Sequence, residues 1–122
     1  MFSLDDTIVA ISSATGPAAR SIVRLSGSDA FGLAERIFSE PLKDIGGFRT
    51  IAGVITIKEP YPISVPSRVY LFRAPRSYTR QDVVEMHVPG ELVASIICST
   101  LISIGARQAQ PGEFTARAFL SG

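Results

Sequence analysis

The chain is poor in the residues that build disulfides and metal sites. It has one cysteine, Cys98, and one histidine, His87, among 122 residues. A single cysteine excludes an intrachain disulfide, and one cysteine with one histidine cannot supply the nitrogen and sulfur ligands of a zinc site. We therefore expect no metal site. Cys98 is interpreted as an inert packing residue, and His87 as a partly buried structural residue in preference to a catalytic base.

Long hydrophobic runs and a strong net charge are also missing. No apolar run reaches the ~18–20 residues that a membrane span needs, and Asp5 and Asp6 stand where a secretory signal would carry bases. Twelve basic and eleven acidic side chains leave a formal net charge of +1, which is too small to indicate nucleic acid or a membrane as a partner. We expect a cytoplasmic protein that does not bind a membrane and is not itself the main RNA-binding surface.

The short motifs of the common enzyme classes are absent. Neither Lys43 nor Lys58 stands in a Gly-x-x-x-x-Gly-Lys-Ser/Thr loop, and no Gly-x-Gly-x-x-Gly follows a predicted strand. No serine or cysteine lies in a nucleophile elbow. We expect no catalytic site within this chain.

The chain does have enough apolar residues to form one folded domain. Hydrophobic residues make up 46% of the chain, which suits a single core at this length. The pattern predicts an α+β domain with a mixed or antiparallel sheet and helices packed on one side. Strands are predicted at residues 7–13, 21–26, 50–58, 68–73 and 82–88, and helices at 29–38, 91–104 and after Pro111. Three prolines, Pro60, Pro62 and Pro66, are expected to keep the segment before the fourth strand out of regular pairing.

The predicted helix at 91–104 has an unusual polar face. Glu91, Ser95, Ser99 and Ser103 follow one another at four-residue spacing, where a solvated face normally carries long charged side chains. Either this face is exposed as it stands, or another domain or subunit covers it. The residues expected to face the core are Leu92, Val93, Ile96, Ile97, Leu101 and Ile102.

Two charged residues, Arg24 and Glu85, each stand between two apolar residues of a predicted strand. Because side chains alternate along a strand, each points away from its apolar neighbours. A carboxylate in such a segment needs a partner. In one interpretation Arg24 and Glu85 form a salt bridge across the sheet. In the other they line a pocket for a polar, planar ligand, where the carboxylate accepts two parallel hydrogen bonds, as from the amino-pyrimidine edge of a pterin, and the guanidinium meets a carbonyl or carboxylate.

Four ordered segments resemble a known family. They are residues 7–11 (TIVAI), 21–27 (SIVRLSG), 77–85 (SYTRQDVVE) and 105–120 (GARQAQPGEFTARAFL). They resemble the N-terminal domain of the tRNA-modification GTPase family MnmE, also called TrmE, and the resemblance runs from Asp6 to Gly122. It implies that residues 1–122 form one domain, similar in fold to the tetrahydrofolate-binding domain of the glycine-cleavage aminomethyltransferase. It also implies that this domain binds 5-formyltetrahydrofolate and forms a homodimer.

The family's folate contacts fall on Arg24 and Glu85, which are thus the implied cofactor-binding residues. A third family contact, a lysine, would be the residue after Gly122. The chain departs from the family in loops: its Pro-Gly-Arg-Gly-Gly loop is replaced at 15–20 (TGPAAR), and its His-Gly-Gly-Pro at 89–92 (PGEL). Losing glycines removes backbone freedom where a ligand approaches. An assembly and dimerisation module that no longer binds folate therefore stays open as the alternative. A free-standing one-carbon transferase is a third, for which 122 residues are too few.

The rest of the family's protein is implied to lie outside this chain. In the family, a helical domain and a potassium-dependent GTPase domain follow, and potassium and magnesium are expected only there. With the flavoprotein MnmG (GidA), the family's protein modifies C5 of the wobble uridine of certain tRNAs. We therefore expect the chain to be one domain of a longer protein, in preference to a truncated homologue standing alone, with GTP hydrolysis wholly outside these residues.

Overall fold

A six-stranded sheet forms the centre of the domain. The computed structural model describes residues 6–13 and 20–121. The strand order is β3-β4-β5-β2-β1-β6, and every neighbouring pair is antiparallel except β1 with β6. The strands are β1 (Ile8–Ser13), β2 (Ser21–Ser26), β3 (Phe48–Ile57), β4 (Ile63–Phe72), β5 (Val83–Val88) and β6 (Arg107–Gln108), and the helices are α1 (Ala30–Glu35), α2 (Glu91–Ser103) and α3 (Glu113–Ser121).

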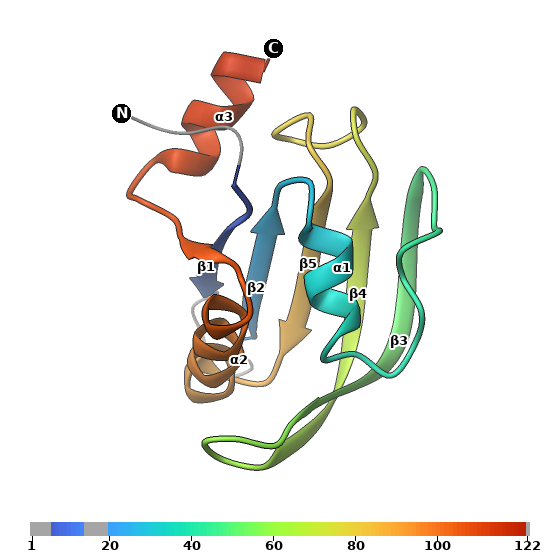
Figure 1. Cartoon of the computed structure of the whole chain (residues 1–122), viewed down its shortest axis with the longest axis vertical. Coiled ribbons are helices and arrows are strands. Elements are labelled where there is room, and N and C mark those ends of the chain that lie inside the picture. Colours follow the sequence, from blue (N-terminus) through green and yellow to red (C-terminus); the bar gives the residue numbers. More distant parts are fainter. Residues whose placement is uncertain (1–5, 14–19, 122) are drawn as a thin grey trace.

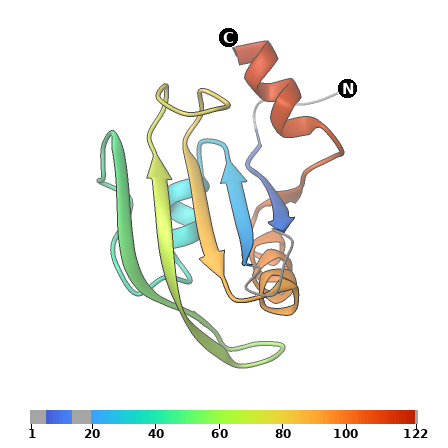
Figure 2. The ribbon, with the colours of Figure 1, turned by 180° about the vertical axis from the view of Figure 1, so that it is seen from behind.

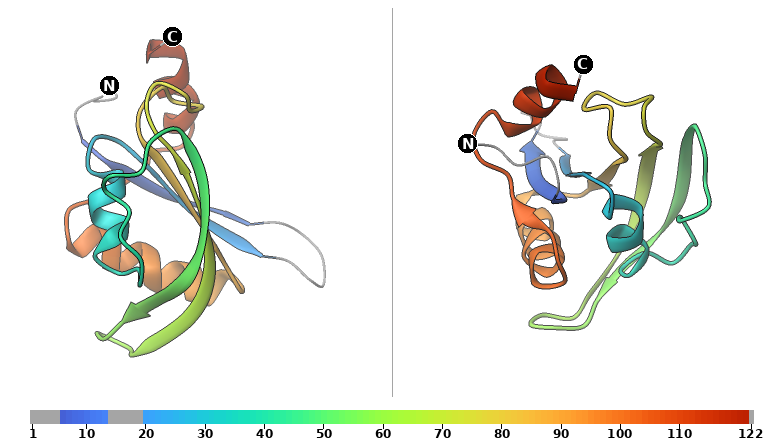
Figure 3. Two further views of the ribbon diagram at one scale, coloured as in Figure 1. Left: turned by 90° about the vertical axis from the view of Figure 1, so that its right-hand side faces the viewer. Right: turned by 45° about the horizontal axis from the view of Figure 1, so that its top comes forward.

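The helices leave one face of the sheet uncovered. Helices α1 and α2 lie on one side, while α3 lies at one end of the sheet (Figures 1 and 3). The predicted α+β class, with a mixed sheet and helices on one side, is confirmed. The altered loop predicted at 15–20 lies outside the described residues except for Arg20.

Side-chain alternation gives the sheet two unlike faces. Leu25 of β2 and Val84 and Met86 of β5 are fully buried, and they belong to the core that includes residues of α1 and α2. The residues between them point to the opposite face, as Arg24 and Glu85 do. We call this side, seen in Figure 2, the open face. The sequence pattern thus placed both charged residues on one face of the sheet.

The expectation for the prolines is wrong at Pro66. Strand β4 begins at Ile63 and pairs with β3 along its whole length, with Pro66 opposite Val54. Strand β4 pairs with β5 only from Arg68 onward. Pro66 therefore lies where β4 has no strand partner on its second side, a position that tolerates a residue without an N–H group.

The first helix is shorter than its periodicity predicts. It ends at Glu35, and the next residues pair with the edge of β3 instead. The Thr56 N–H donates to the Ile37 carbonyl oxygen at 2.9 Å, and the Ser39 N–H donates to the Val54 carbonyl oxygen at 2.9 Å. Tertiary pairing therefore ends the helix about one turn before the predicted residue 38.

Helix α2 buries a narrower stripe than predicted. Its buried residues are Ala94, Ile97, Cys98 and Leu101. Leu92 is 76% exposed and Ile102 39%, so the expectation that these two face the core is wrong. At about 100° per residue, Leu92 lies on the far side of the helix from Ala94. The serine face is exposed in the single chain. Neither α2 nor another helix of the described residues is long and apolar enough to cross a membrane.

Arg80 has a backbone conformation that favours glycine. Its φ is 61°, in the left-handed region that costs a non-glycine residue roughly 1–2 kcal/mol. We expect Arg80→Gly to raise the free energy of unfolding by about 0.5–1 kcal/mol, because the greater freedom of glycine in the unfolded chain offsets part of the gain. Denaturant unfolding measures this. Arg80→Ala is the matched control: it removes the guanidinium but keeps the Cβ, and an equal gain in both variants would contradict the backbone explanation.

Candidate functional site

Arg24 and Glu85 form an ion pair on the open face. They are direct cross-strand neighbours in the antiparallel pairing of β2 with β5. Arg24 Nε donates to Glu85 Oε2 at 2.8 Å, and the side chains are 33% and 20% exposed. The first interpretation of these residues, a salt bridge across the sheet, is therefore confirmed.

The same two residues line a cavity. It has a volume of about 430 Å³ and lies between β2, β4, β5, the loop that joins β4 to β5, and the first turn of α3. This volume falls within the range of small-molecule sites. The lining residues are Arg24, Phe72, Tyr78, Thr79, Val83, Glu85, Phe114 and Thr115. Arg24 and Glu85 thus form a salt bridge and line the cavity at the same time.

The ion pair uses only some of the hydrogen-bonding groups of Arg24 and Glu85. Its contact uses Nε of Arg24 and one carboxylate oxygen, Oε2, of Glu85. Within the described part of the chain, the terminal guanidinium nitrogens of Arg24 donate no hydrogen bond, and Oε1 of Glu85 has His87 Nε2 as its neighbour at 3.8 Å, beyond hydrogen-bond range. The wall of the cavity can therefore offer a carboxylate oxygen as acceptor and guanidinium N–H groups as donors to a polar ligand.

Aromatic side chains form much of the remaining wall. The guanidinium carbon of Arg24 lies 5.9 Å from the centroid of the Phe114 ring, and Phe72 packs against Phe48 with centroids 5.0 Å apart. The Tyr78 hydroxyl donates to Thr115 Oγ1 at 3.4 Å, and both residues belong to the lining. Ring faces beside a carboxylate suit a planar, polar ligand.

His87 lies near the pair but does not line the cavity. Its Nε2 is 3.8 Å from Glu85 Oε1, and its ring packs on Tyr70 with centroids 4.4 Å apart. Burial lowers the pKa of His87, and the nearby Glu85 opposes this only in part. The structure places His87 as a partly buried packing residue. Among the described residues, no group of three or more His, Cys, Asp and Glu side chains is arranged to hold a metal ion.

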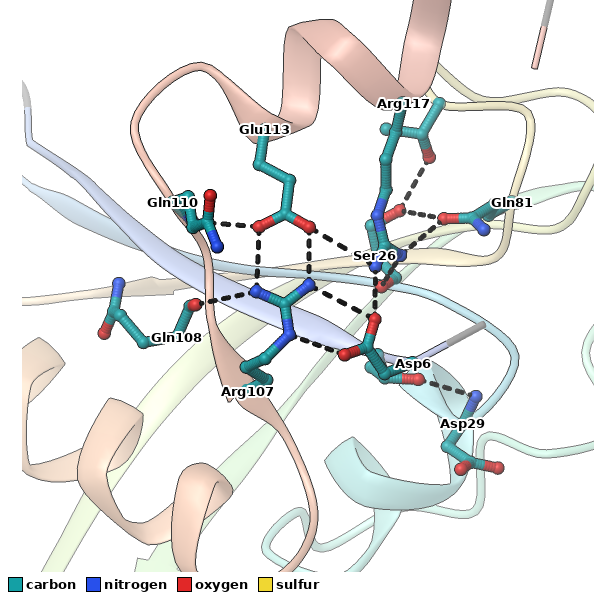
Figure 4. A network of polar contacts seen from close by, with 11 residues as sticks. Asp6, Ser26, Asp29, Gln81, Arg107, Gln108, Gln110, Glu113 and Arg117 are labelled. Carbon is teal, nitrogen blue, oxygen red and sulfur yellow. Dashed lines mark hydrogen bonds and ion pairs between the residues drawn. The ribbon is translucent and has the colours of Figure 1, made fainter. Parts of the chain in front are cut away.

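A partly buried cluster of charges beside the cavity was not predicted. We call Asp6, Arg107, Glu113 and Arg117 the four-charge cluster (Figure 4). Glu113 and Arg117, one turn apart in α3, are 1% and 0% exposed. The two carboxylates balance the two guanidiniums, as buried charges require.

Arg107 joins the two carboxylates of the four-charge cluster. It donates to Asp6 Oδ2 at 2.5 Å through Nε, and to Glu113 Oε1 at 3.0 Å and Oε2 at 2.5 Å through its terminal nitrogens. Glu113 also accepts the Gln110 N–H at 2.9 Å, which satisfies a backbone group at the start of α3. The cluster thereby ties the beginning of α3 to the beginning of β1.

Arg117 extends the cluster toward the cavity. Its Nη2 donates to Asp6 Oδ1 at 2.8 Å, while Nη1 donates to Gln81 Oε1 at 2.9 Å and to the Ser26 carbonyl oxygen at 3.2 Å. The only sequence signal for this arrangement is the four-residue spacing of Glu113 and Arg117 after Pro111 and Gly112, and that spacing equally suits an exposed helical ion pair.

The four-charge cluster makes stability depend on acid pH. Hydrogen bonds from Arg107 hold the pKa values of Asp6 and Glu113 below their ordinary range. Since both pKa values are lowered in the folded state, the stabilisation is complete above the unfolded pKa values of about 4 and is lost as pH falls through the folded pKa values.

We expect Asp6→Asn to unfold more easily at pH 7 and to lose less stability between pH 7 and pH 3 than the wild type. Asp44→Asn, an exposed carboxylate, is the control that should keep the wild-type slope; identical slopes for Asp6→Asn and wild type would contradict the assignment.

The fold and the cavity define a class: a small α+β domain with a carboxylate–guanidinium pair and aromatic walls on the open face of its sheet. Residues 7–122 match the family described as "GTP-binding protein TrmE N-terminus", and the chain belongs to this family. The predicted resemblance is confirmed.

Curated relatives support this membership. The chain is 42% identical over 124 residues to the tRNA modification GTPase MnmE of Nostoc sp., covering 98% of this chain and 27% of the relative. It is 42% identical to the protein of the same name from Geobacillus thermodenitrificans, covering 96% and 26%. With that of Streptococcus thermophilus it shares 44% identity, again covering 96% and 26%. The chain thus spans about a quarter of the length of these relatives.

Proposed function

We propose that this chain is the folate-binding and dimerisation domain of a tRNA-modifying GTPase, and that it binds 5-formyltetrahydrofolate in the cavity lined by Arg24 and Glu85. The observation that carries the proposal is the ion pair in the cavity wall, which retains an accepting carboxylate oxygen and donating guanidinium nitrogens. The relatives are tRNA modification GTPases by name, which supports the wider role.

The chemistry of the cavity fits a reduced folate. Glu85 is assigned to accept hydrogen bonds from the amino-pyrimidine edge, and Arg24 to donate to a carbonyl or carboxylate of the ligand. Phe72 and Phe114 supply ring faces for the planar part. When bound, the folate carries the one-carbon unit for the modification.

The rest of the proposed activity belongs to a longer protein. There, GTP hydrolysis with potassium and magnesium lies outside residues 1–122, and a MnmG (GidA)-type flavoprotein is the partner. The substrate is the wobble uridine of tRNA, modified at C5. A homodimer of this domain is the assembly we propose for that protein.

One observation favours the second candidate, a dimerisation module that binds no folate. Arg24 and Glu85 are already paired with one another at 2.8 Å, so this pair has a structural role that needs no ligand. The changed segment at 89–92 does not favour this candidate, because it does not line the cavity. Its departure from the family pattern therefore changes no residue of the cavity lining.

Calorimetric titration of the wild-type chain with 5-formyltetrahydrofolate separates the two candidates, with sedimentation run in parallel to give the oligomeric state. We expect a dimer that binds one folate per chain with saturation. A dimer that binds none would overturn the folate proposal in favour of the assembly module. A monomer that binds folate would overturn the dimerisation proposal alone.

A further inference from the structure

We infer that Arg117 and Gln81 are positioning residues for the cavity: together they fix the helix wall and the loop wall to each other and to the sheet. The inference rests on the proposed function for what the cavity binds. Neither residue lines the cavity, so each acts through the residues that do.

The cavity has two kinds of wall. Arg24 and Glu85 belong to paired strands in the middle of the sheet. Tyr78 and Thr79 belong instead to the loop between β4 and β5, and Phe114 to the first turn of α3. A helix of nine residues is marginal by itself. The placement of these two walls therefore depends on side-chain contacts.

The loop is fixed at its base by one ion pair. Arg73 Nη1 lies 2.9 Å from Asp82 Oδ2, and Asp82 Oδ1 accepts the Ala74 N–H at 2.8 Å. These contacts close the two ends of the loop but do not hold its middle. The middle is joined to the end of the loop where Ser77 Oγ donates to the Gln81 carbonyl oxygen at 2.5 Å.

Gln81, which directly precedes Asp82, connects the loop to the sheet and to α3. Its Oε1 accepts Arg117 Nη1 at 2.9 Å and Ser26 Oγ at 3.0 Å. The hydroxyls of Ser26 and Thr79 share a hydrogen bond of 2.7 Å, and Thr79 is fully buried. A continuous set of hydrogen bonds thus runs from α3 through Gln81 and Ser26 to a residue of the cavity wall.

Only arginine can make the contacts of Arg117. Its two terminal nitrogens bind Asp6 before β1, the Ser26 carbonyl oxygen in β2, and Gln81 in the loop. A planar guanidinium presents donors in fixed directions, whereas the ammonium of lysine is a single point charge. Arg117 is fully buried and engaged by these partners, so it holds elements together and does not meet the ligand.

The test uses Gln81→Met as the mild variant and Arg117→Lys as the stronger one. We expect Gln81→Met to weaken 5-formyltetrahydrofolate binding about tenfold, with Arg117→Lys weakening it further where it folds. Without ligand, we expect amide exchange to accelerate in residues 77–81 and in 113–118 together, while β2 and β5 keep wild-type rates. Glu35→Gln is the matched stability control, because Glu35 Oε2 accepts the Leu42 and Lys43 N–H groups away from the cavity. It should lose stability but keep wild-type affinity.

A double-mutant cycle shows whether Gln81 acts through the helix wall. In a Phe114→Ala background, the loss of affinity caused by Gln81→Met should shrink to less than about twofold. Additive losses in the cycle, or wild-type affinity in Gln81→Met, would overturn the inference. If the wild type binds no folate, the proposed function fails, and amide exchange still decides the coupling: joint acceleration of both walls supports it, and acceleration of one wall alone overturns it.

Discussion

Replacing Glu113 with alanine is expected to lower the free energy of unfolding by about 3–5 kcal/mol. Glu113 is 1% exposed and accepts two hydrogen bonds from Arg107 as well as the Gln110 N–H. Its removal leaves two guanidiniums, those of Arg107 and Arg117, with Asp6 as the one remaining carboxylate of the cluster. Removing one partner of a buried ion pair lowers stability by more than the intact pair contributes, because the remaining charge is left without its partner.

Urea unfolding at pH 7 measures this loss, with two variants for comparison. Glu113→Gln keeps an oxygen for the Gln110 N–H and should lose less stability than Glu113→Ala. Glu40→Ala removes an exposed carboxylate and should change the free energy of unfolding by less than about 0.5 kcal/mol. A loss below about 1 kcal/mol in Glu113→Ala would show that the four-charge cluster is not a principal stabilising feature.

Replacing Glu85 with alanine is expected to weaken binding of 5-formyltetrahydrofolate about 10- to 100-fold. Hydrogen bonds to a charged group contribute about 1.5–3 kcal/mol, which corresponds to that range. Arg24→Ala should weaken binding by the lower part of this range, because Arg24 is assigned to contact only one carbonyl or carboxylate of the folate. Stability should change little in either variant, since the pair is partly exposed.

Arg68→Ala is the matched control for these two variants. Arg68 lies on the open face of β4, beside His87 in register, and donates to Thr50 Oγ1 at 3.2 Å. The Arg68→Ala substitution removes a cation from the same face without changing the cavity lining, and this variant should keep wild-type affinity. If the wild type binds folate and Glu85→Ala binds it equally well, the ligand lies elsewhere.

The sequence predicts the faces of the sheet well because alternation is a local property. Arg24 and Glu85 each follow from their apolar neighbours, and the sheet places both on the open face. Their contact depends on β2 pairing with β5 at one register, which local pattern does not specify. The sequence therefore left two interpretations, and tertiary structure shows that the salt bridge and the cavity lining coexist.

The four-charge cluster could not be predicted, because its burial is not local. Glu113 and Arg117 have the spacing of an exposed helical ion pair. Instead, Arg117 contacts Asp6, Ser26 and Gln81, all of them distant in sequence. The prediction at Pro66 was wrong for a related reason: its tolerance follows from where β5 stops, not from the residues around it.

Mapping of backbone and side-chain NMR shifts during titration with 5-formyltetrahydrofolate shows where on the chain the folate binds. We expect the largest changes on Arg24 and Glu85, on Tyr78 and Thr79 in the loop, and on Phe114 in α3. A second hollow of about 330 Å³ lies beside α1, next to Lys43. Changes centred there, with Arg24 and Glu85 unaffected, would contradict the assignment of the site.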